Sequence, residues 1–136
     1  KVSAGLREMS MELPVPGILE SPFGFFESKI FSYKKQKIEE KKYTKWFDYD
    51  KIKNSPCVRT RRQGDYLTVN SEGGRKKLNR IFIDEKIPAE MRDRLPVVAV
   101  GSEILWIPGG RMNEKYKITS TTGRVLELHY QGGALA

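Results

Sequence analysis

The chain has 136 residues, of which 38% are hydrophobic and 31% are charged, so its apolar side chains suffice for one packed domain but not for a second sizeable core. A single cysteine, Cys57, and a single histidine, His129, exclude an internal disulfide framework and the usual zinc clusters of cysteine and histidine. The formal net charge of +8, from 25 Lys and Arg against 17 Asp and Glu, favours a polyanionic partner, with nucleic acid as the first candidate.

The first third of the chain predicts strands separated by a polar loop. Residues 9–15 alternate apolar and polar side chains, which is the period of a half-buried strand. Residues 23–33 are rich in aromatic and β-branched side chains, which predicts a second strand that pairs antiparallel with the first and has a bulge near residues 25–26. Residues 34–45 are too polar to face a core, so we expect a solvated loop or an exposed hairpin end, followed by a short strand over residues 46–50.

Two short strands are expected next, around a glycine turn. Residues 57–59 and 67–69 are β-prone, and the turn over residues 61–65 places Gly64 where a positive φ is needed. Residues 71–74 form a flexible connector.

Two consecutive helices are predicted after this connector. Residues 75–87 carry one apolar stripe at helical spacing. The stripe consists of Leu78, Ile81, Phe82 and Ile87. Pro88 lacks an amide hydrogen, so it ends this helix and can open a second one over residues 89–95, which Pro96 ends.

The last third of the chain returns to strands. Residues 97–100 and 104–107 flank Gly101 and Ser102, and glycine at the first position of a two-residue loop predicts a type II′ hairpin. The next turn, over residues 108–110, presents Arg111.

The final strands are expected over residues 116–119 and 124–130, with His129 as an ordinary strand residue and residues 131–136 frayed. The order of strands, two helices and strands predicts an α+β fold with a mostly antiparallel sheet or sandwich.

The richest cluster of candidate binding residues surrounds Gly64 and the pair Gly73 and Gly74. Glycines directly before a helix expose its first amide hydrogens, and neighbouring lysines add full positive charge, a combination suited to phosphate. Arginine adds a planar fork that fits phosphate and base edges, and Asp65 is expected to orient one of the arginines rather than to bind a metal. A flexible loop followed by a solvated helix face is an equally open alternative. The candidates are Arg59, Arg61, Arg62, Gly64, Asp65, Gly73, Gly74, Arg75, Lys76, Lys77 and Arg80.

Other conspicuous residues favour structural roles. The lysines of residues 34–45 are interleaved with glutamates, which is typical of a solvated surface. Residues 71–75 have neither the Walker spacing nor the residue order of a PP-loop, so no ATP site is predicted there. Asp93 is expected in a local ion pair, and Trp46 and Trp106 are expected in the core.

Four sequence strings succeed one another in the second half of the chain. They are VRTRRQGD at residues 58–65, GRKKLNRIFID at 74–84, IP at 87–88 with RDRLP at 92–96, and ILWIPG at 104–109. Together, from about residue 57 to about residue 128, they resemble the C-terminal domain of tRNA(Ile)-lysidine synthetase. The resemblance implies a sandwich-like domain related to one in the β subunit of phenylalanyl-tRNA synthetase.

The resemblance also implies a function. Full-length members of the family resemble a PP-loop ATPase at their N-terminus, which uses ATP and Mg to adenylate the wobble cytidine of tRNA(Ile) with a CAU anticodon, and lysine then displaces AMP. The C-terminal domain is implied to recognise this tRNA, chiefly at the acceptor stem. We therefore expect a non-catalytic fragment that holds no cofactor or metal itself, and whose partners are the tRNA and its own catalytic domain. The resemblance leaves a homodimer of the parent enzyme open.

Residue by residue, the family pattern matches Arg59, Arg61, Gly64, Asp65, Gly74, Lys76, Lys77, Leu78, Arg92, Pro96 and Gly109. It implies tRNA contact by Arg59, Arg61, Lys76 and Lys77, with Arg62, Arg75, Arg80 and Arg111 as neighbours. Residues 1–55 are then the leading strands of the C-terminal region, packed with the recognition domain after them. Residues 56–130 are that tRNA-recognition domain, and residues 131–136 are the tail.

Two other functions stay open at this point. One is a non-enzymatic docking module whose basic surface meets an acidic protein. The other is a self-contained enzyme, for example a nuclease that uses Asp65, Asp84 and Glu85, although no motif brings these carboxylates together. The first residues lack an apolar leader and no run is long enough to span a bilayer, so we expect a cytoplasmic location. The chain begins at Lys1 rather than at a methionine, so we expect a piece of a longer protein.

Overall fold

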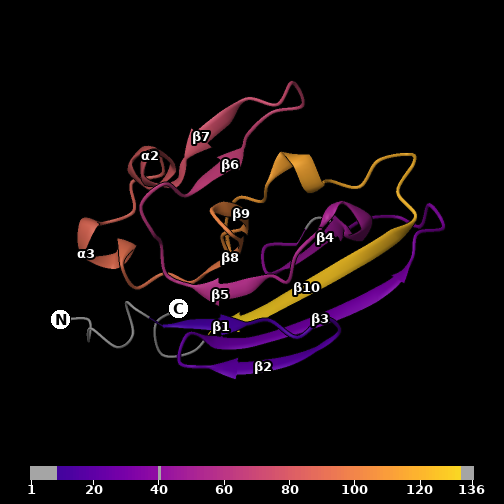
Figure 1. Ribbon diagram of the computed structural model, residues 1–136, viewed down its shortest axis with the longest axis horizontal. Coiled ribbons are helices and arrows are strands. Elements are labelled where there is room, and N and C mark those ends of the chain that lie inside the picture. The colour runs from indigo at the N-terminus through magenta and orange to yellow at the C-terminus, as the bar shows by residue number, and fades with distance from the viewer. Residues whose placement is uncertain (1–8, 40, 133–136) are drawn as a thin grey trace.

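The computed structural model describes residues 9–39 and 41–132, which form two β-sheets and two short α-helices (Figure 1). Six strands make one sheet, in the order β1-β5-β8-β9-β6-β7, and four make the other, in the order β2-β3-β10-β4. Strand pairs are antiparallel except for β6 and β9, which run parallel. The predicted α+β fold with mostly antiparallel strands is confirmed.

In chain order the elements are β1 (Ser10–Glu12), β2 (Gly17–Ser21), β3 (Gly24–Ser32), β4 (Thr44–Asp48), the 3-10 turn η1 (Tyr49–Lys51), β5 (Cys57–Arg59), β6 (Tyr66–Thr68), β7 (Arg75–Lys77), α2 (Leu78–Asp84), α3 (Ala89–Arg92), β8 (Val97–Val100), β9 (Glu103–Trp106), the 3-10 turn η2 (Glu114–Tyr116) and β10 (Arg124–Gly132). None of the helices in this part of the chain is long and apolar enough to cross a membrane.

Two hydrophobic cores lie on opposite faces of the six-stranded sheet. Side chains alternate along β8: Val98 packs in the core between the two sheets, whereas Val97 and Ala99 pack in the second core with Phe82 of α2. A strand that is covered on both faces needs an almost continuous apolar run, and β8 has one. The buried side chains of α2 pack in the second core against this sheet, so the domain has three layers: α2, the six-stranded sheet and the four-stranded sheet.

The last strand, β10, lies inside the four-stranded sheet between β3 and β4. Leu126 and Leu128 face the core, whereas Glu127 and His129 alternate with them on the outer face. The prediction that His129 is an ordinary strand residue is confirmed, and its ring Nδ1 lies 2.8 Å from the hydroxyl of Thr44 on β4.

The pairing predicted for the first strand is wrong. β1 pairs with β5 in the six-stranded sheet, and β3 pairs with β2 and β10 in the other sheet. Two prolines and Gly17 redirect the chain between the sheets, and this change of direction is invisible to an alternation pattern. The strand β2 was not predicted. The bulge predicted at residues 25–26 is wrong, because β3 keeps a continuous register with β10. The side chains therefore alternate, with Phe26 in the core and Phe25 on the other face.

The first helix begins three residues later than predicted. Arg75–Lys77 is the strand β7, which pairs with β6, and the helix starts at Leu78, where the apolar stripe itself starts. The side chain of Asn70 stabilises the hairpin turn before β7, since its Oδ1 accepts hydrogen bonds from the amides of Glu72 and Gly74 at 3.0 and 2.9 Å. The second helix, α3, ends at Arg92 rather than at residue 95.

The predicted hairpin over residues 97–107 is confirmed as β8 and β9, with Gly101 at a φ of +60°. The strand predicted at residues 116–119 is wrong, because the Asn113 side chain accepts the amide of Lys115 at 2.9 Å and caps the 3-10 turn η2 instead. Strand β10 continues to Gly132, so residues 131 and 132 are not frayed, and residues 133–136 lie outside the described residues.

The two tryptophans differ. Trp106 is fully buried between the sheets, as predicted. Trp46 is only half-buried, because it lies on the outer face of β4. There its ring contacts Phe31 edge-on, with centroids 5.0 Å apart, and its Nε1 donates to the carboxylate of Glu127 at 2.9 Å. The prediction of a core position is therefore wrong for Trp46.

Candidate nucleic-acid interface

Arg59 lies in the interior of the protein. Its side chain is 2% exposed, and its terminal nitrogens donate to the two carboxylate oxygens of Asp65 at 2.8 and 2.9 Å and to the carbonyl of Gly101 at 2.7 Å. Burial lowers the pKa of the Arg59 guanidinium, but hydrogen bonding and the charge of Asp65 raise it by more, so its pKa lies above the ordinary value. The expectation that Arg59 contacts RNA is corrected, because a buried guanidinium with these partners is a structural group.

Asp65 holds the arginine turn in shape. Its carboxylate also accepts the backbone amide of Arg62 at 2.7 Å, and its carbonyl accepts the amide of Leu78, the first residue of α2, at 2.9 Å. Gly64 has a φ of +92°, which a residue with a side chain rarely adopts. The prediction that Asp65 orients an arginine is confirmed, and that arginine is Arg59.

Arg61 joins the turn to both helices. Its Nε donates to Asp93 at 2.9 Å, and its Nη1 donates to Asn79 of α2 at 3.0 Å. Asp93 is thus in an ion pair with a residue 32 positions away, and the local ion pair predicted for it is wrong. Arg61 keeps about a quarter of its side chain exposed, and Arg62 beside it is exposed.

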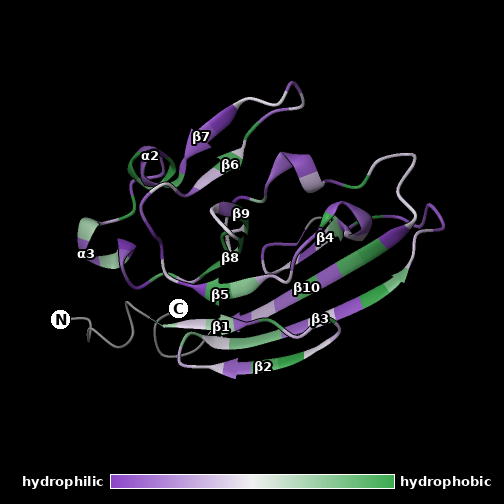
Figure 2. Cartoon of the chain, in the orientation of Figure 1, coloured by the Kyte–Doolittle hydropathy of each residue, from purple (hydrophilic) through white to green (hydrophobic). Residues whose placement is uncertain are grey.

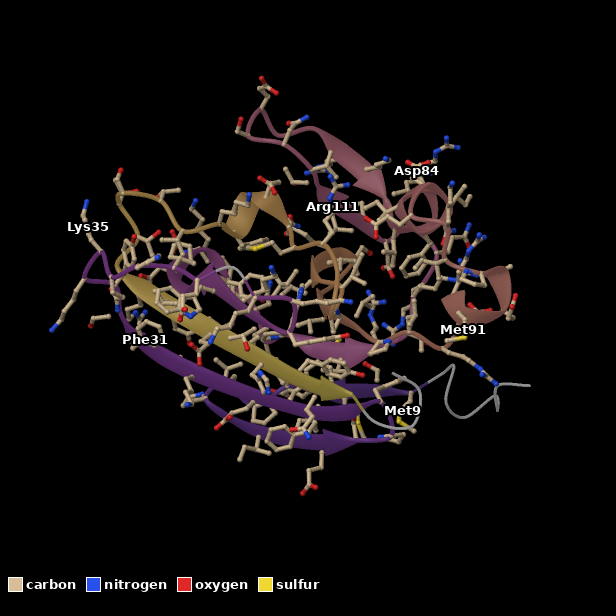
Figure 3. All side chains as sticks on the ribbon, turned by 180° about the vertical axis from the view of Figure 1, so that it is seen from behind. Met9, Phe31, Lys35, Asp84, Met91 and Arg111 are labelled. Carbon is tan, nitrogen blue, oxygen red and sulfur yellow. The ribbon has the colours of Figure 1, made fainter. Side chains whose placement is uncertain are left out.

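The β6–β7 hairpin divides the next cations between its two faces. Directly opposed residues of an antiparallel pair share a face, so Lys76 lies on the face of its partner Leu67, which packs in the core with α2. There Lys76 and Arg80 both form ion pairs with Asp84, which is labelled in Figure 3. The Nε of Arg80 lies 3.1 Å from the Asp84 carboxylate. The hydrogen bond from Lys76 is the largest cause that lowers the pKa of Asp84 below its ordinary value, and the charge of Arg80 adds to it.

Arg75 and Lys77 lie on the opposite face of the hairpin. Lys77 is directly across from Tyr66, and the Arg75 guanidinium lies over the Tyr66 ring, 4.6 Å from its centroid. Both basic side chains are exposed. Figure 2 shows β7 as a hydrophilic strand along its length.

The helix start predicted to bind phosphate is not formed. Gly73 and Gly74 precede a strand instead of a helix, and the residue at the N-cap of α2 is Lys77. Arg111 lies in the loop after β9, half-buried, with its carbonyl accepting the amide of Ile107 at 2.9 Å. The exposed cations among the predicted candidates therefore lie around the β6–β7 hairpin and the turn at Arg62, and not at a helix start with free glycine amides.

Three lysines that the sequence did not single out lie beside this group. An open pocket of about 280 Å³ is lined by Lys51, Lys53 and Lys115 together with Tyr66 of β6 and Glu103 of β9. No spacing rule connects these lysines, because η1, the chain after it and η2 meet only in the folded domain. The sequence therefore carries no local signal by which they could be found.

Asp65, Asp84 and Glu85, the carboxylates considered for a nuclease, do not gather in one site. Asp65 is bound to Arg59, and Asp84 is bound to Lys76 and Arg80. Among the residues that the structure describes, no three His, Cys, Asp or Glu side chains lie close enough to hold a metal ion.

The chain is similar to several known proteins. A family model described as TilS substrate C-terminal domain matches residues 57–128. The tRNA(Ile)-lysidine synthase of Caldanaerobacter subterraneus subsp. tengcongensis is 50% identical over 88 residues, which are 65% of this chain and 19% of that protein. The tRNA(Ile)-lysidine synthase of Geobacillus kaustophilus is 37% identical over 123 residues, 88% of this chain and 26% of that protein.

The fold itself matches a solved structure. A crystal structure of a TILS C-terminal domain has a TM-score of 0.75 and 34% identity to this chain, and the match covers 91% of this chain and 96% of the other. The chain spans about a fifth to a quarter of the length of these two synthases.

Proposed function

Since the chain belongs to the family of TilS substrate C-terminal domains, we propose that it is the tRNA-binding domain of a tRNA(Ile)-lysidine synthase. Its ligand is tRNA(Ile) with a CAU anticodon, held chiefly at the acceptor stem. The observation that carries this proposal is the group of exposed cations around the β6–β7 hairpin, which lies within the matched family region. This group, named here the hairpin cluster, consists of Arg62, Arg75, Lys77 and Arg80.

The chemistry of the hairpin cluster suits the backbone of an RNA duplex. A-form RNA presents phosphates and 2′-hydroxyls across a shallow minor groove, so a surface rich in arginine and lysine reads mainly shape and charge. Arg61 and Lys76 add to the cluster and, like its member Arg80, each already has an acidic partner. With about four to six phosphate contacts, the logarithm of affinity should fall with the logarithm of salt concentration at a slope of about −3 to −5.

The parent enzyme would supply the chemistry that this chain lacks. In our proposal, ATP and Mg bind to the remaining part of the synthase, where the wobble cytidine is activated and joined to lysine. This chain contributes by holding the tRNA while that reaction proceeds. It therefore acts as a non-catalytic domain of a carbon-nitrogen ligase.

Binding across a salt series tests the proposal. The ligands are tRNA(Ile) with a CAU anticodon, an elongator methionine tRNA and an acidic polypeptide. We expect a steep salt slope for RNA and tighter binding of the isoleucine tRNA. Equal affinity for both tRNAs would assign discrimination to the rest of the enzyme, and tighter binding of the polypeptide would favour a protein-docking module instead.

A further inference from the structure

A second basic surface lies next to the hairpin cluster, in the open pocket of about 280 Å³. Its walls come from four places in the chain: η1 and the residues after it, the β8–β9 turn, η2, and Tyr66 of β6. Two of its three lysines, Lys51 and Lys53, precede the region that the family model matches. We call this the lysine pocket.

Two lysines of the pocket are only loosely held by the protein. Lys51 Nζ lies 3.9 Å from the buried carboxylate of Asp48 and 3.4 Å from the carbonyl of Lys115. Lys115 Nζ lies 3.5 Å from the carboxylate of Glu103. Strong charge-assisted hydrogen bonds are shorter, at about 2.7 to 2.9 Å, so these ammonium groups keep donors for another anion.

The third lysine has a short hydrogen bond to a carbonyl rather than to a carboxylate. Lys53 Nζ donates to the carbonyl of Asp50 at 2.7 Å, and a carbonyl does not neutralise its charge. Among the described residues that line the pocket, Glu103 is the one acidic residue, and its carboxylate also accepts the hydroxyl of the buried Tyr116 at 2.5 Å. Burial, followed by the hydrogen bond to Glu103, raises the pKa of Tyr116, so this hydroxyl stays a donor. The wall therefore carries three positive charges against one negative charge.

Tyr66 joins the lysine pocket to the hairpin cluster. Its side chain lines the pocket, Lys77 is its direct cross-strand partner, and Arg75 covers its ring. The face of the hairpin that carries Arg75 and Lys77 is thus continuous with the pocket. Three lysines thus line the same pocket as Tyr66, and two further cations, both from β7, lie beside this tyrosine.

From this geometry we propose that the lysine pocket binds a phosphodiester group of the tRNA backbone, adjacent to the contacts of the hairpin cluster. The inference rests on the proposed function, since it names a further part of the same RNA-binding surface. Lysine suits this role because an ammonium acts as a compact point charge toward phosphate and needs no fixed fork geometry. The pocket is open to solvent and polar, which fits a charged backbone group better than a buried apolar ligand.

The test replaces the three lysines by glutamine, in K51Q/K53Q/K115Q, and measures binding of tRNA(Ile) with a CAU anticodon over a salt series. We expect the salt slope to become shallower by about one and the affinity near 0.1 M salt to fall roughly tenfold. Ser102, an exposed residue at the pocket, offers an independent variant: S102E adds a carboxylate without removing a lysine, and we expect it to weaken tRNA binding as well.

The matched control is K34Q/K35Q/K37Q, which removes the same charge from an exposed loop. Figure 3 shows Lys35 of that loop at one extreme of the molecule. An equal loss of affinity in this control would overturn the inference, because net charge alone would then explain the effect. Unchanged binding in both pocket variants, with the wild type binding tRNA, would also overturn it and leave the proposed function standing. A wild-type chain without tRNA affinity would instead refute the proposed function, and the inference with it.

Discussion

Arg59 and Asp65 lie six positions apart in the sequence and form a bidentate ion pair at 2.8 and 2.9 Å in the interior of the domain. The turn between them carries Arg61 and Arg62 to the surface. The buried pair therefore sets where the exposed arginines lie, although it touches no solvent itself.

Substitution of Asp65 by alanine should strongly destabilise the domain. It leaves the Arg59 guanidinium buried without its counter-ion, and removing one partner of a buried pair costs about 3 to 5 kcal/mol. The free energy of unfolding in denaturant measures this loss. The double substitution R59M/D65L removes both charges and should cost less than the single one. A single variant that loses under about 1 kcal/mol would show that the pair is dispensable.

Lys77→Ala should weaken tRNA binding more than Lys76→Ala does. Lys77 is exposed and has no ion pair among residues 9–39 and 41–132, whereas the charge of Lys76 is already compensated by Asp84. We expect Lys77→Ala to make the salt slope shallower by about one. Lys77→Ala should unfold at the same denaturant concentration as the wild type, whereas Lys76→Ala loses its ion pair with Asp84 and should unfold at a slightly lower one. Equal, undiminished tRNA affinity in the two variants would remove β7 from the interface.

Asp84→Asn should reduce the dependence of stability on acid pH. The folded-state pKa of Asp84 is lowered, so its ionised form stabilises the fold above the ordinary carboxyl pKa, and this contribution is lost as the pH falls through the lowered value. The free energy of unfolding of the wild type should therefore exceed that of the variant near neutral pH, and the two should converge in strong acid. Parallel curves across this range would contradict the ion pairs of Asp84 with Lys76 and Arg80.

Phe82→Ala should damage the core between α2 and the six-stranded sheet. Phe82 is 1% exposed, and truncation of a buried phenylalanine costs about 3 to 5 kcal/mol. Ile83, the next residue, is 48% exposed and provides the matched control, because Ile83→Ala should change the free energy of unfolding little. Similar losses in both variants would contradict the orientation of α2 on the sheet.

The sequence predicted the elements that depend on residues close together in the chain. The β8–β9 hairpin follows from the glycine between two apolar runs, and the helix stripe from Leu78 onward follows from apolar spacing. The turn at Gly64 and the pairing of Asp65 with an arginine were predicted for the same reason, because the seven residues 59–65 contain both partners and the turn between them.

The failures concern contacts between distant segments. Arg59 belongs by sequence to a basic motif typical of a surface, but in the fold it is buried against Asp65 and the carbonyl of Gly101, 42 positions away. Lys51, Lys53 and Lys115 converge because η1 and η2 approach β6, which no spacing along the chain encodes. The pairing of β1 with β5 in the six-stranded sheet also joins distant segments, so no local pattern predicts it.

The place of β10 has a consequence for how the domain is made. This strand ends the described part of the chain, yet it lies between β3 and β4, and Arg124 pairs with Ser32 across 92 residues. During synthesis on the ribosome, β3 and β4 emerge long before the strand that must separate them, so each waits with an unpaired edge. The four-stranded sheet can close only when residues 124–132 arrive, which makes its assembly a late event and favours slow folding.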